Sequence, residues 1–267
     1  PPQARAQASL AISADRERWF LVNAAPDLAG SLERIARPPA NGQPRHNPID
    51  AVLLTDAELD HTAGLLSLRE TPSLTVVATA WVHRTAAPLL GILSAYCVLH
   101  RQEVGPGVER PLDGSPLTYR AVPTGSTKRP RYAAHRPPDP TAVVGYRFTD
   151  VRTGGSLLYL PCVPALDDRL LAEFAVASCV LLDGTCWSDD ELARVGLSEK
   201  TSRSMGHLPV SGADGSLATL AGLPAIRRIY THLNNTNPLL VEDSVERKQV
   251  EALGVEVAYD GMEVEVR

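Results

Sequence analysis

The fold is decided by the stretch AVLLTDAELDHTAGLLSL (residues 51–68). It begins with a short apolar run at residues 51–54, which is typical of a buried strand. In open α/β sheets, ligands bind beyond the carboxyl ends of the strands. We therefore expect the polar cluster that follows the run to lie at a ligand-binding edge of a sheet. Its four ionisable residues are Asp56, Glu58, Asp60 and His61.

The composition is typical of an ordinary soluble globular protein. The 267 residues are 44% hydrophobic and 21% charged, and they suffice for one large domain or two small ones. The net charge of −5 and the pI near 5.8 argue against a nucleic-acid partner. No apolar run approaches the length of about 18 residues that indicates a membrane helix. No secretory signal pattern opens the chain, so we expect a cytoplasmic protein.

The four cysteines are scattered and form no CxxC pair. This spacing predicts neither a zinc ribbon nor a dense disulfide framework. Because cysteine is among the residues most often buried, we expect reduced thiols in the core. They are Cys97, Cys162, Cys179 and Cys186.

Apolar runs and turn residues predict the order of the elements. Residues 8–14 and 18–23 flank an acidic turn and are expected to form a hairpin. Further strands are expected at residues 74–78, 117–123, 142–148, 156–160, 178–182 and 228–231, with short strand-like runs at 255–259 and 262–266. Helices are expected after Pro26-Asp27, at 64–68, from 79 to about 99, near 167–176, at 216–220 and at 241–253. Neither an internal repeat nor an interdomain linker is evident, so one α/β domain with a mixed sheet is the simplest interpretation.

Two loops stand out from this pattern. Residues 37–47 are rich in Pro, Gly and Asn and lead into the strand before the acidic cluster. Residues 125–140 are rich in Pro and carry several cationic side chains. The second loop is either a solvated excursion or, because long loops in compact domains are often functional, part of a site for an acidic substrate.

Other polar residues follow strand ends elsewhere in the chain. Asp183 closes one expected strand, His232 closes another, and His207 lies in a loop that contains Gly and Pro. Carboxylates and imidazoles together suit zinc, iron or manganese, and two histidines with one carboxylate are typical of non-haem Fe(II) sites. Taken singly, Asp60 could instead cap a helix, and His207 could be an ordinary hydrogen-bonded loop histidine.

The joint pattern is similar to that of a known fold family. The spacing Asp56-x-Glu58-x-Asp60-His61 after a strand resembles the metal motif HxHxDH of the metallo-β-lactamase fold. Asp56 and Glu58 replace the two leading histidines, whereas Asp60 and His61 keep their places. His232 matches the last metal histidine of that family, at a strand end.

A narrower resemblance is to the B proteins of pyrroloquinoline quinone (PQQ) biosynthesis. Three segments carry it: TDAELDHTAGLL (55–66), MGHLPVSG (205–212) and THLNNTNP (231–238). The similarity runs over essentially the whole chain. It implies a single metallo-β-lactamase-like domain over residues 1–267, an α/β fold built as an αββα sandwich of two mixed β-sheets flanked by helices.

The chain departs from its relatives in two respects. That family usually begins with a further strand and a cysteine-rich loop that can hold a structural metal, and we expect both to be missing here. Hydrolases of this superfold place a histidine after the strand equivalent to residues 117–123, where this chain has Pro123-Thr124-Gly125-Ser126. Their bridging aspartate would fall near Pro161-Cys162. A two-zinc hydrolase is therefore disfavoured, and a single metal is expected.

The resemblance implies an oxidoreductase that matures the cross-linked Glu–Tyr unit of a ribosomally made peptide into PQQ. The implied step is hydroxylation of the tyrosine ring by a mononuclear non-haem iron, with Fe(II) as cofactor and O₂ as co-substrate. We expect His61, His232 and Asp60 to be the core ligands, with Glu58 or Asp56 completing or hydrogen-bonding the shell. Zinc could substitute for iron, because intrinsic affinities favour zinc at many such sites.

Two further sets of residues are assigned to the reaction. His207 and Asp183 are expected to transfer protons or position the substrate. The implied substrate is a small acidic diamino acid, free or still within a peptide, so basic groups should line its pocket. The candidates for substrate binding are Arg129, Arg131, Arg203 and, unless it only supports a turn, Asn235.

Two other functions remain open. The eroded metal motif would suit a carrier that binds or transports PQQ or its precursor without chemistry. An ordinary metal-dependent hydrolase, such as a phosphodiesterase, ranks third because several of its histidines are missing. The sequence leaves open whether the protein is a monomer or a homodimer.

Overall fold

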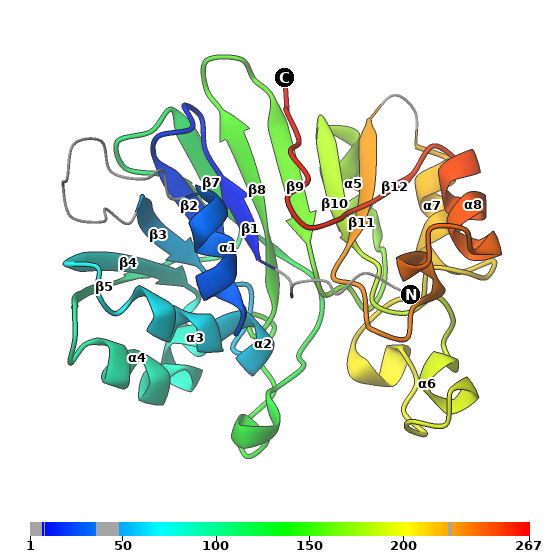
Figure 1. The fold of residues 1–267 in the computed structure, drawn as a ribbon, viewed down its shortest axis with the longest axis horizontal. Coiled ribbons are helices and arrows are strands. Elements are labelled where there is room, and N and C mark those ends of the chain that lie inside the picture. The colour runs from blue at the N-terminus through cyan, green and yellow to red at the C-terminus, as the bar shows by residue number, and fades with distance from the viewer. Residues whose placement is uncertain (1–6, 8, 36–47, 224–225) are drawn as a thin grey trace.

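Two β-sheets lie face to face in the computed structural model, which describes residues 7, 9–35, 48–223 and 226–267. The first sheet has five strands in the order β1-β2-β3-β4-β5 (Figure 1). Only β1 and β2 are antiparallel, and the other neighbours are parallel. The strands are β1 (Leu10–Ile12), β2 (Trp19–Val22), β3 (Ile49–Leu53), β4 (Ser73–Ala78) and β5 (Val98–Glu103).

The second sheet has seven strands in the order β12-β11-β10-β9-β8-β7-β6. Strands β6 to β9 pair with their neighbours in antiparallel fashion, whereas strands β9 to β12 pair in parallel fashion. Both sheets are therefore mixed. The strands are β6 (Glu109–Pro111), β7 (Leu117–Pro123), β8 (Val144–Asp150), β9 (Ser156–Leu160), β10 (Cys179–Asp183), β11 (Arg227–Thr231) and β12 (Glu256–Val257).

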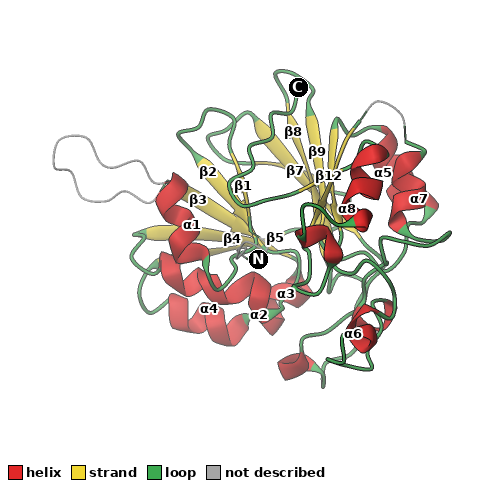
Figure 2. Ribbon diagram, turned by 45° about the vertical axis from the view of Figure 1, so that its right-hand side comes forward, coloured by secondary structure: helices red, strands yellow, loops and turns green. Residues whose placement is uncertain are grey.

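Helices cover the outer face of each sheet, which gives four layers in the order α, β, β, α (Figure 2). The first sheet is covered by α1 (Leu28–Ile35), α2 (Leu59–Thr62), the 3₁₀ helix η2 (Ala63–Leu68), α3 (Ala80–Thr85) and α4 (Ala87–Leu93). The second is covered by α5 (Asp168–Ala175), α7 (Ser216–Ala221) and α8 (Val245–Ala252). Four short helices complete the described chain: η3 (Arg131–Ala133), α6 (Glu191–Arg194), η4 (Arg203–Met205) and η5 (Pro238–Leu240). The expected αββα sandwich is confirmed.

The core forms three layers because strand side chains alternate between the two faces of a sheet. In β2, Phe20 and Val22 pack between the sheets, whereas Leu21 packs beneath the helices. In β10, Leu181 packs between the sheets, and Val180 packs beneath the helices of the other side. Both sheets are thus buried on two faces, which explains why their central strands read as continuous apolar runs.

Most elements confirm the sequence-based predictions. Residues 117–123 and 156–160 form β7 and β9 with the expected bounds, and the opening hairpin is formed by β1 and β2. The Asp15 carboxylate closes that hairpin by accepting the N–H groups of Glu17 and Arg18. The final helix starts later than expected, at Val245, because Ser244 caps it by accepting the N–H of Arg247.

Three predictions were wrong. The helix expected from residue 79 to about 99 is two helices, α3 and α4, and the chain then enters β5. The strands β5 and β6 were missed because both are largely exposed and lack an apolar alternation. Residues 262–266 form no strand, although Met262, Val264 and Val266 pack against the core between the sheets. The loop predicted at residues 37–47 lies outside the described residues.

The carboxyl ends of β3, β9, β10 and β11 meet at one edge of the sandwich, which carries α2 and the loop with η3 at the bottom of Figure 1. The close approach there depends on Gly64. Its N–H donates to the carbonyl oxygen of Ala24, 2.9 Å away. A Cβ atom at position 64 would lie 2.0 Å from the carbonyl oxygen of Ala25, so only glycine fits without movement.

We expect Gly64→Ala to lower the free energy of unfolding by about 1–3 kcal/mol, because the added methyl group overpacks a rigid backbone contact. Chemical denaturation measures the effect. Gly30→Ala is the matched control, because a Cβ at the exposed Gly30 of α1 meets nothing within 4 Å. The Gly30→Ala variant should be more stable than the unmodified protein by about 0.5–1 kcal/mol, because alanine has a higher helix propensity than glycine. Equal stabilities of the two variants would contradict this account of the contact between Gly64 of η2 and residues 24–25, which follow β2.

Candidate metal centre

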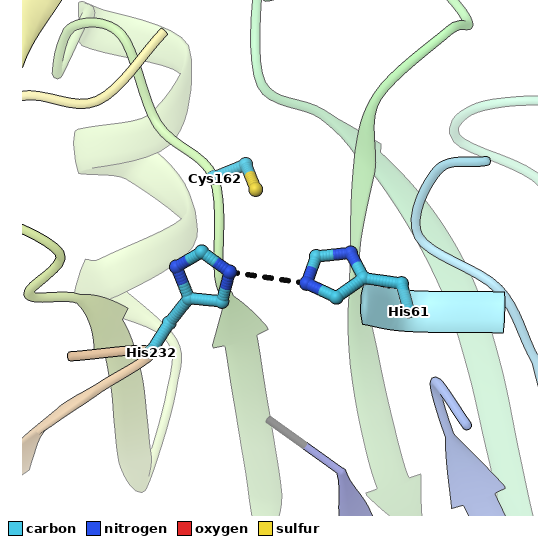
Figure 3. Close-up of side chains that lie close together, drawn as sticks. All are labelled: His61, Cys162 and His232. Carbon is cyan, nitrogen blue, oxygen red and sulfur yellow. Dashed lines mark hydrogen bonds between the residues drawn. The ribbon is translucent and has the colours of Figure 1, made fainter. Parts of the chain in front are cut away.

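Two histidines from opposite halves of the chain meet at the shared edge of the two sheets. His61 lies in α2, and His232 directly follows β11 with a left-handed backbone (φ 57°). Their Nε2 atoms are 3.0 Å apart, and the rings lie edge to face (Figure 3). Because both side chains are largely buried, each ring needs a fixed partner for its other nitrogen.

The chain holds His61 from behind through a buried polar network. The side chain of Asn23, at the end of β2, bonds both the N–H and the hydroxyl of Thr55, at the end of β3. The Thr55 hydroxyl lies 2.9 Å from Asp56 Oδ2, and the same oxygen lies 2.7 Å from His61 Nδ1. Asp56 Oδ1 accepts the N–H of Glu58. This network fixes the direction in which His61 Nε2 points.

Charges reinforce that arrangement. Burial alone would raise the pKa of the Asp56 carboxyl, but the charge and hydrogen bond of His61 hold it well below its usual range. Burial alone would lower the pKa of His61, yet the Asp56 carboxylate raises it. The proton on His61 Nδ1 is therefore donated to Asp56, and Nε2 faces His232.

The second half of the chain holds His232 through a similar buried polar network. Thr185 Oγ1, two residues after β10, lies 2.7 Å from His232 Nδ1 and 2.6 Å from Asp183 Oδ1. Asp183 Oδ2 accepts the proton on His207 Nδ1 at 2.7 Å and also the N–H of Val163 at 2.9 Å. Burial would raise the pKa of Asp183, but His207 and His232 hold it well below its usual range. Burial lowers the pKa of His232.

The hydrogen bonds assign the ring nitrogens. Thr185 has one hydroxyl proton, and the Asp183 carboxylate is its strongest acceptor, so His232 Nδ1 donates to Thr185. His61 Nδ1 donates to Asp56. In their neutral forms both rings would thus present Nε2 lone pairs to each other across 3.0 Å. Such a contact requires a proton or a cation between the nitrogens, and a carboxylate behind each imidazole is the usual support of a metal-ligating histidine.

Sequence reasoning missed one member of this cluster. Cys162, which follows β9, places its Sγ atom so that it and one nitrogen of each of His61 and His232 all lie within 4.8 Å of one another (Figure 3). The sequence alone predicts a core thiol at Cys162. The available signal was its position after a strand end, where hydrolases of this superfold place a bridging aspartate. A second group of potential ligands is formed by Asp183, His207 and His232.

The predicted carboxylate ligands are placed differently from one another. Asp56 hydrogen-bonds to His61 Nδ1 and therefore lies behind that ring, away from the Nε2 atom that faces His232. Glu58 is half-buried, its pKa is raised by burial, and Lys128 Nζ lies 3.8 Å from its carboxylate. Asp60 is exposed in the first turn of α2, and among the described residues it belongs to neither group of potential ligands. The assignment of Asp60 and Glu58 as ligands stays a prediction.

The residues predicted to bind substrate are only partly brought together. Arg129 and Arg203 line an open cleft of about 390 Å³ between the loop that precedes η3 and the segment around η4. Arg131 is exposed on η3, and Asn235 is exposed after β11. The cleft also contains Lys128, a further cationic residue of the loop at residues 125–140, for which binding of an acidic substrate is one of the two interpretations of the sequence. Its other lining residues include Ser126, Thr127, Ser204 and Gly206.

The asparagine run after His232 has a structural role. Asn237 is buried, and its side-chain amide donates to the carbonyl oxygens of Gly184 and Thr185. The N–H of Asn234 also donates to the Thr185 carbonyl. These contacts tie the loop after β11 to the loop after β10, and so hold His232 against Thr185.

The helices in the part of the chain that the structure describes are too short or too polar to span a membrane.

Comparisons with known proteins agree on one family. The family model described as "Beta-lactamase superfamily domain" matches residues 18–233. The coenzyme PQQ synthesis protein B of Pseudomonas putida (strain W619) is 41% identical over 275 residues, which cover 98% of this chain and 88% of that protein. The protein of the same name from Cupriavidus necator is 44% identical over 270 residues, covering 97% of this chain and 87% of that protein.

Solved structures give the same result. The chain is similar to a Zn²⁺-bound PqqB from Methylobacterium extorquens, with a TM-score of 0.88 and 36% identity over 98% of this chain and 88% of that one. A diphosphatase from the PhnP family has a TM-score of 0.64 at 20% identity, over 98% of this chain and 86% of that one. The second likeness shows the shared fold alone.

We expect Asp56→Asn to weaken Zn²⁺ binding by about 10- to 100-fold, because losing the carboxylate behind His61 removes what fixes its tautomer and basicity. Competition with a chromophoric chelator measures the affinity. Asp243→Asn is the control, because that carboxylate is exposed and lies in the loop before α8. Equal zinc affinities of Asp56→Asn and the unmodified protein would show that the Asp56–His61 pair does not serve a metal.

Proposed function

Because the chain belongs to the coenzyme PQQ synthesis protein B family of the β-lactamase superfamily, we propose that it acts in PQQ biosynthesis as an iron- and O₂-dependent hydroxylase. The proposed reaction places one oxygen atom of O₂ on the tyrosine ring of the Glu–Tyr-derived precursor, and the other oxygen atom leaves as water. The two electrons that this requires come from oxidation of the hydroxylated ring to the quinone. The observation that supports it best is the convergence of two buried imidazole Nε2 atoms, each backed by its own hydrogen-bonded network. This arrangement suits one metal ion.

The residues fit a mononuclear centre better than a binuclear one. His61 and His232 would hold the ion, and the predicted carboxylates Asp60 and Glu58 lie in or next to the same short helix α2. Two histidines with a carboxylate and open positions suit Fe(II), which when bound would supply the activation of O₂. Zinc is a plausible substitute, since the relative from Methylobacterium extorquens is described as Zn²⁺-bound.

The Asp183–His207 pair is suited to proton transfer. Asp183 fixes the proton on His207 Nδ1, so the Nε2 atom of that ring is left as a base. The rings of His207 and His232 are stacked with centroids 5.3 Å apart, which places this base beside the proposed centre. We propose that His207 accepts the proton that the tyrosine phenol loses as the ring is oxidised.

The cleft beside the centre suits an acidic substrate. Lys128, Arg129 and Arg203 contribute three cationic side chains to it, and no carboxylate of the described residues is among its lining residues. Lys128 connects the cleft to the centre, because its ammonium lies 3.8 Å from Glu58. Such a cleft would bind the carboxylates of a diamino acid, whether free or still part of a peptide. Arg131 is exposed two residues after Arg129, and Asn235 is exposed three residues after His232. Both remain proposed contacts of a larger substrate.

A carrier of PQQ or its precursor is the second candidate. The observation that favours it is the same cationic cleft, which would bind an acidic molecule without any chemistry. The carrier and the hydroxylase differ in one respect that an experiment can test. Only the hydroxylase consumes O₂ when iron and substrate are both present.

Anaerobic reconstitution with Fe(II), followed by O₂ exposure with a Glu–Tyr-derived diamino acid, should give iron-dependent O₂ uptake and a product that has gained oxygen by mass spectrometry. We expect His61→Ala and His232→Ala each to lose at least about 10-fold in bound iron and to abolish uptake, because each removes a ligand. His100→Ala, an exposed histidine of β5, is the control. Tight substrate binding without O₂ uptake would favour the carrier.

His207→Ala should retain iron but slow turnover by roughly 10²–10⁴-fold, the range typical of a lost general base. The defect should shrink as the pH is raised, because hydroxide can then remove the phenolic proton. Single-turnover rates against pH test this, with iron content measured in parallel. Loss of iron in His207→Ala would place His207 among the ligands instead.

Arg203→Gln should raise KM about 10-fold or more with little change in kcat, because a lost charge-assisted hydrogen bond costs about 1.5–3 kcal/mol. Arg169→Gln, an exposed arginine on α5 that pairs with Asp167, is the control. Unchanged KM for Arg203→Gln would show that this cleft does not bind the substrate.

A further inference from the structure

The polar groups behind the two histidines have their partners, so these carboxylates are not free to bind a metal. Asp56 Oδ2 contacts the Thr55 hydroxyl and His61 Nδ1, and its Oδ1 accepts the N–H of Glu58. Both oxygens are thereby directed at protein donors. Asp56 is a positioning residue on this evidence, and it lies on the side of His61 that faces away from His232.

Asp183 is in the same situation. Its Oδ1 accepts the N–H and the hydroxyl of Thr185, and its Oδ2 accepts the N–H of Val163 and the proton on His207 Nδ1. A metal bound to Asp183 would have to displace one of these four buried donors. The group formed by Asp183, His207 and His232 is therefore a poor site for an ion, although its atoms lie close together.

In the group of potential ligands that contains Cys162, three donor atoms are available once these bonds are assigned: His61 Nε2, His232 Nε2 and Cys162 Sγ. The thiol is 4% exposed, and it lies 4.0 Å from Asp56 Oδ2, the outer limit of a weak S–H hydrogen bond. The sulfur lies above the gap between the two rings in Figure 3. One ligand atom of each of the three residues lies within 4.8 Å of the others.

We propose that Cys162 is a thiolate ligand of the metal that His61 and His232 hold. This inference rests on the metal binding proposed above and replaces the predicted carboxylate with a sulfur donor. Metal–ligand bonds of about 2.0–2.3 Å allow two ligands of one ion to be at most about 4.5 Å apart. The three ligand atoms lie within 4.8 Å of one another, so side-chain shifts of a few tenths of an ångström at most would let them share an ion. A thiol that coordinates such an ion is deprotonated, and its proton leaves to solvent.

The sulfur donor has consequences for which metal binds. Thiolate and imidazole ligands favour zinc, cobalt and iron over magnesium, calcium and manganese. Three protein ligands leave at least one position open for a further ligand. The thiolate also brings a negative charge to the ion directly, so that Asp60 and Glu58 are free to act elsewhere, Glu58 with Lys128.

Cobalt(II) titration of the metal-free full-length chain under anaerobic conditions tests the proposal, because thiolate-bound cobalt has an intense charge-transfer absorption in the near ultraviolet. We expect the unmodified protein to show that band at one cobalt per chain. Cys162→Ser should lose the band and bind cobalt at least about 10-fold more weakly. Cys179→Ser, another buried free thiol, in β10 between the sheets, should keep both.

The possible outcomes separate this inference from the proposed function. Cobalt binding without the band in the unmodified protein would overturn the role of Cys162 and leave a histidine-based centre in place. A band that persists in Cys162→Ser would also overturn it, because another thiol would then be the ligand. No cobalt binding at all would overturn both. Should Cys162→Ser fail to fold by circular dichroism, zinc X-ray absorption of the unmodified protein still decides, since a Zn–S distance of about 2.3 Å must be present.

Discussion

The approach of two imidazole nitrogens to 3.0 Å is the constraint on which the edge of this sandwich depends. His61 and His232 are 171 positions apart in the sequence, and they follow strands of different sheets, β3 and β11, so the contact joins the two halves of the fold. Two lone pairs at this distance repel each other unless a proton or a cation lies between them. The chain nevertheless fixes both rings from behind, which leaves neither ring free to turn away.

The two halves of the fold fix their histidines with the same kinds of side chain. β3 ends at Leu53 and is followed by Leu54-Thr55-Asp56, and β10 ends at Asp183 and is followed by Gly184-Thr185. On each side a threonine hydroxyl and a carboxylate form one buried unit that supports a histidine. Strain accompanies the arrangement, because Asn23 and His232 both have a left-handed backbone outside glycine. Such strain is retained only where surrounding contacts impose it, and here the asparagine run after His232 supplies them.

The sequence was sufficient to predict those parts of the fold and site that have a local signature. Two strand ends can be predicted from local sequence: one lies between the apolar run and the acidic segment that leads to His61, and the other lies at His232. Because the carboxyl ends of parallel strands meet at one edge of a sheet, both ends are expected at the same site. β5 was not predictable in this way, because it is an exposed edge strand whose polar residues show no period. Cys162 was missed for a different reason. A single cysteine without a CxxC partner indicates a core thiol, and only its position after a strand end points to the shared edge, where the fold brings it close to His61 and His232.

The replaced histidines of the metal motif support the proposal that this site holds one metal ion rather than two. Positions 56 and 58, which hold metal ligands in the hydrolases of this fold, carry carboxylates here, and Asp56 is turned to the rear of His61. The segment after β7 also lacks the hydrolase histidine, and four residues beyond Thr124 it presents Lys128. Burial alone would lower the pKa of Lys128, but the acidic groups around it raise that pKa, so it stays charged 3.8 Å from Glu58. The ammonium of Lys128 thus partly balances the negative charge of Glu58. Lys128 also lines the cationic cleft, so one side chain contributes both to that cleft and to the neutralisation of Glu58.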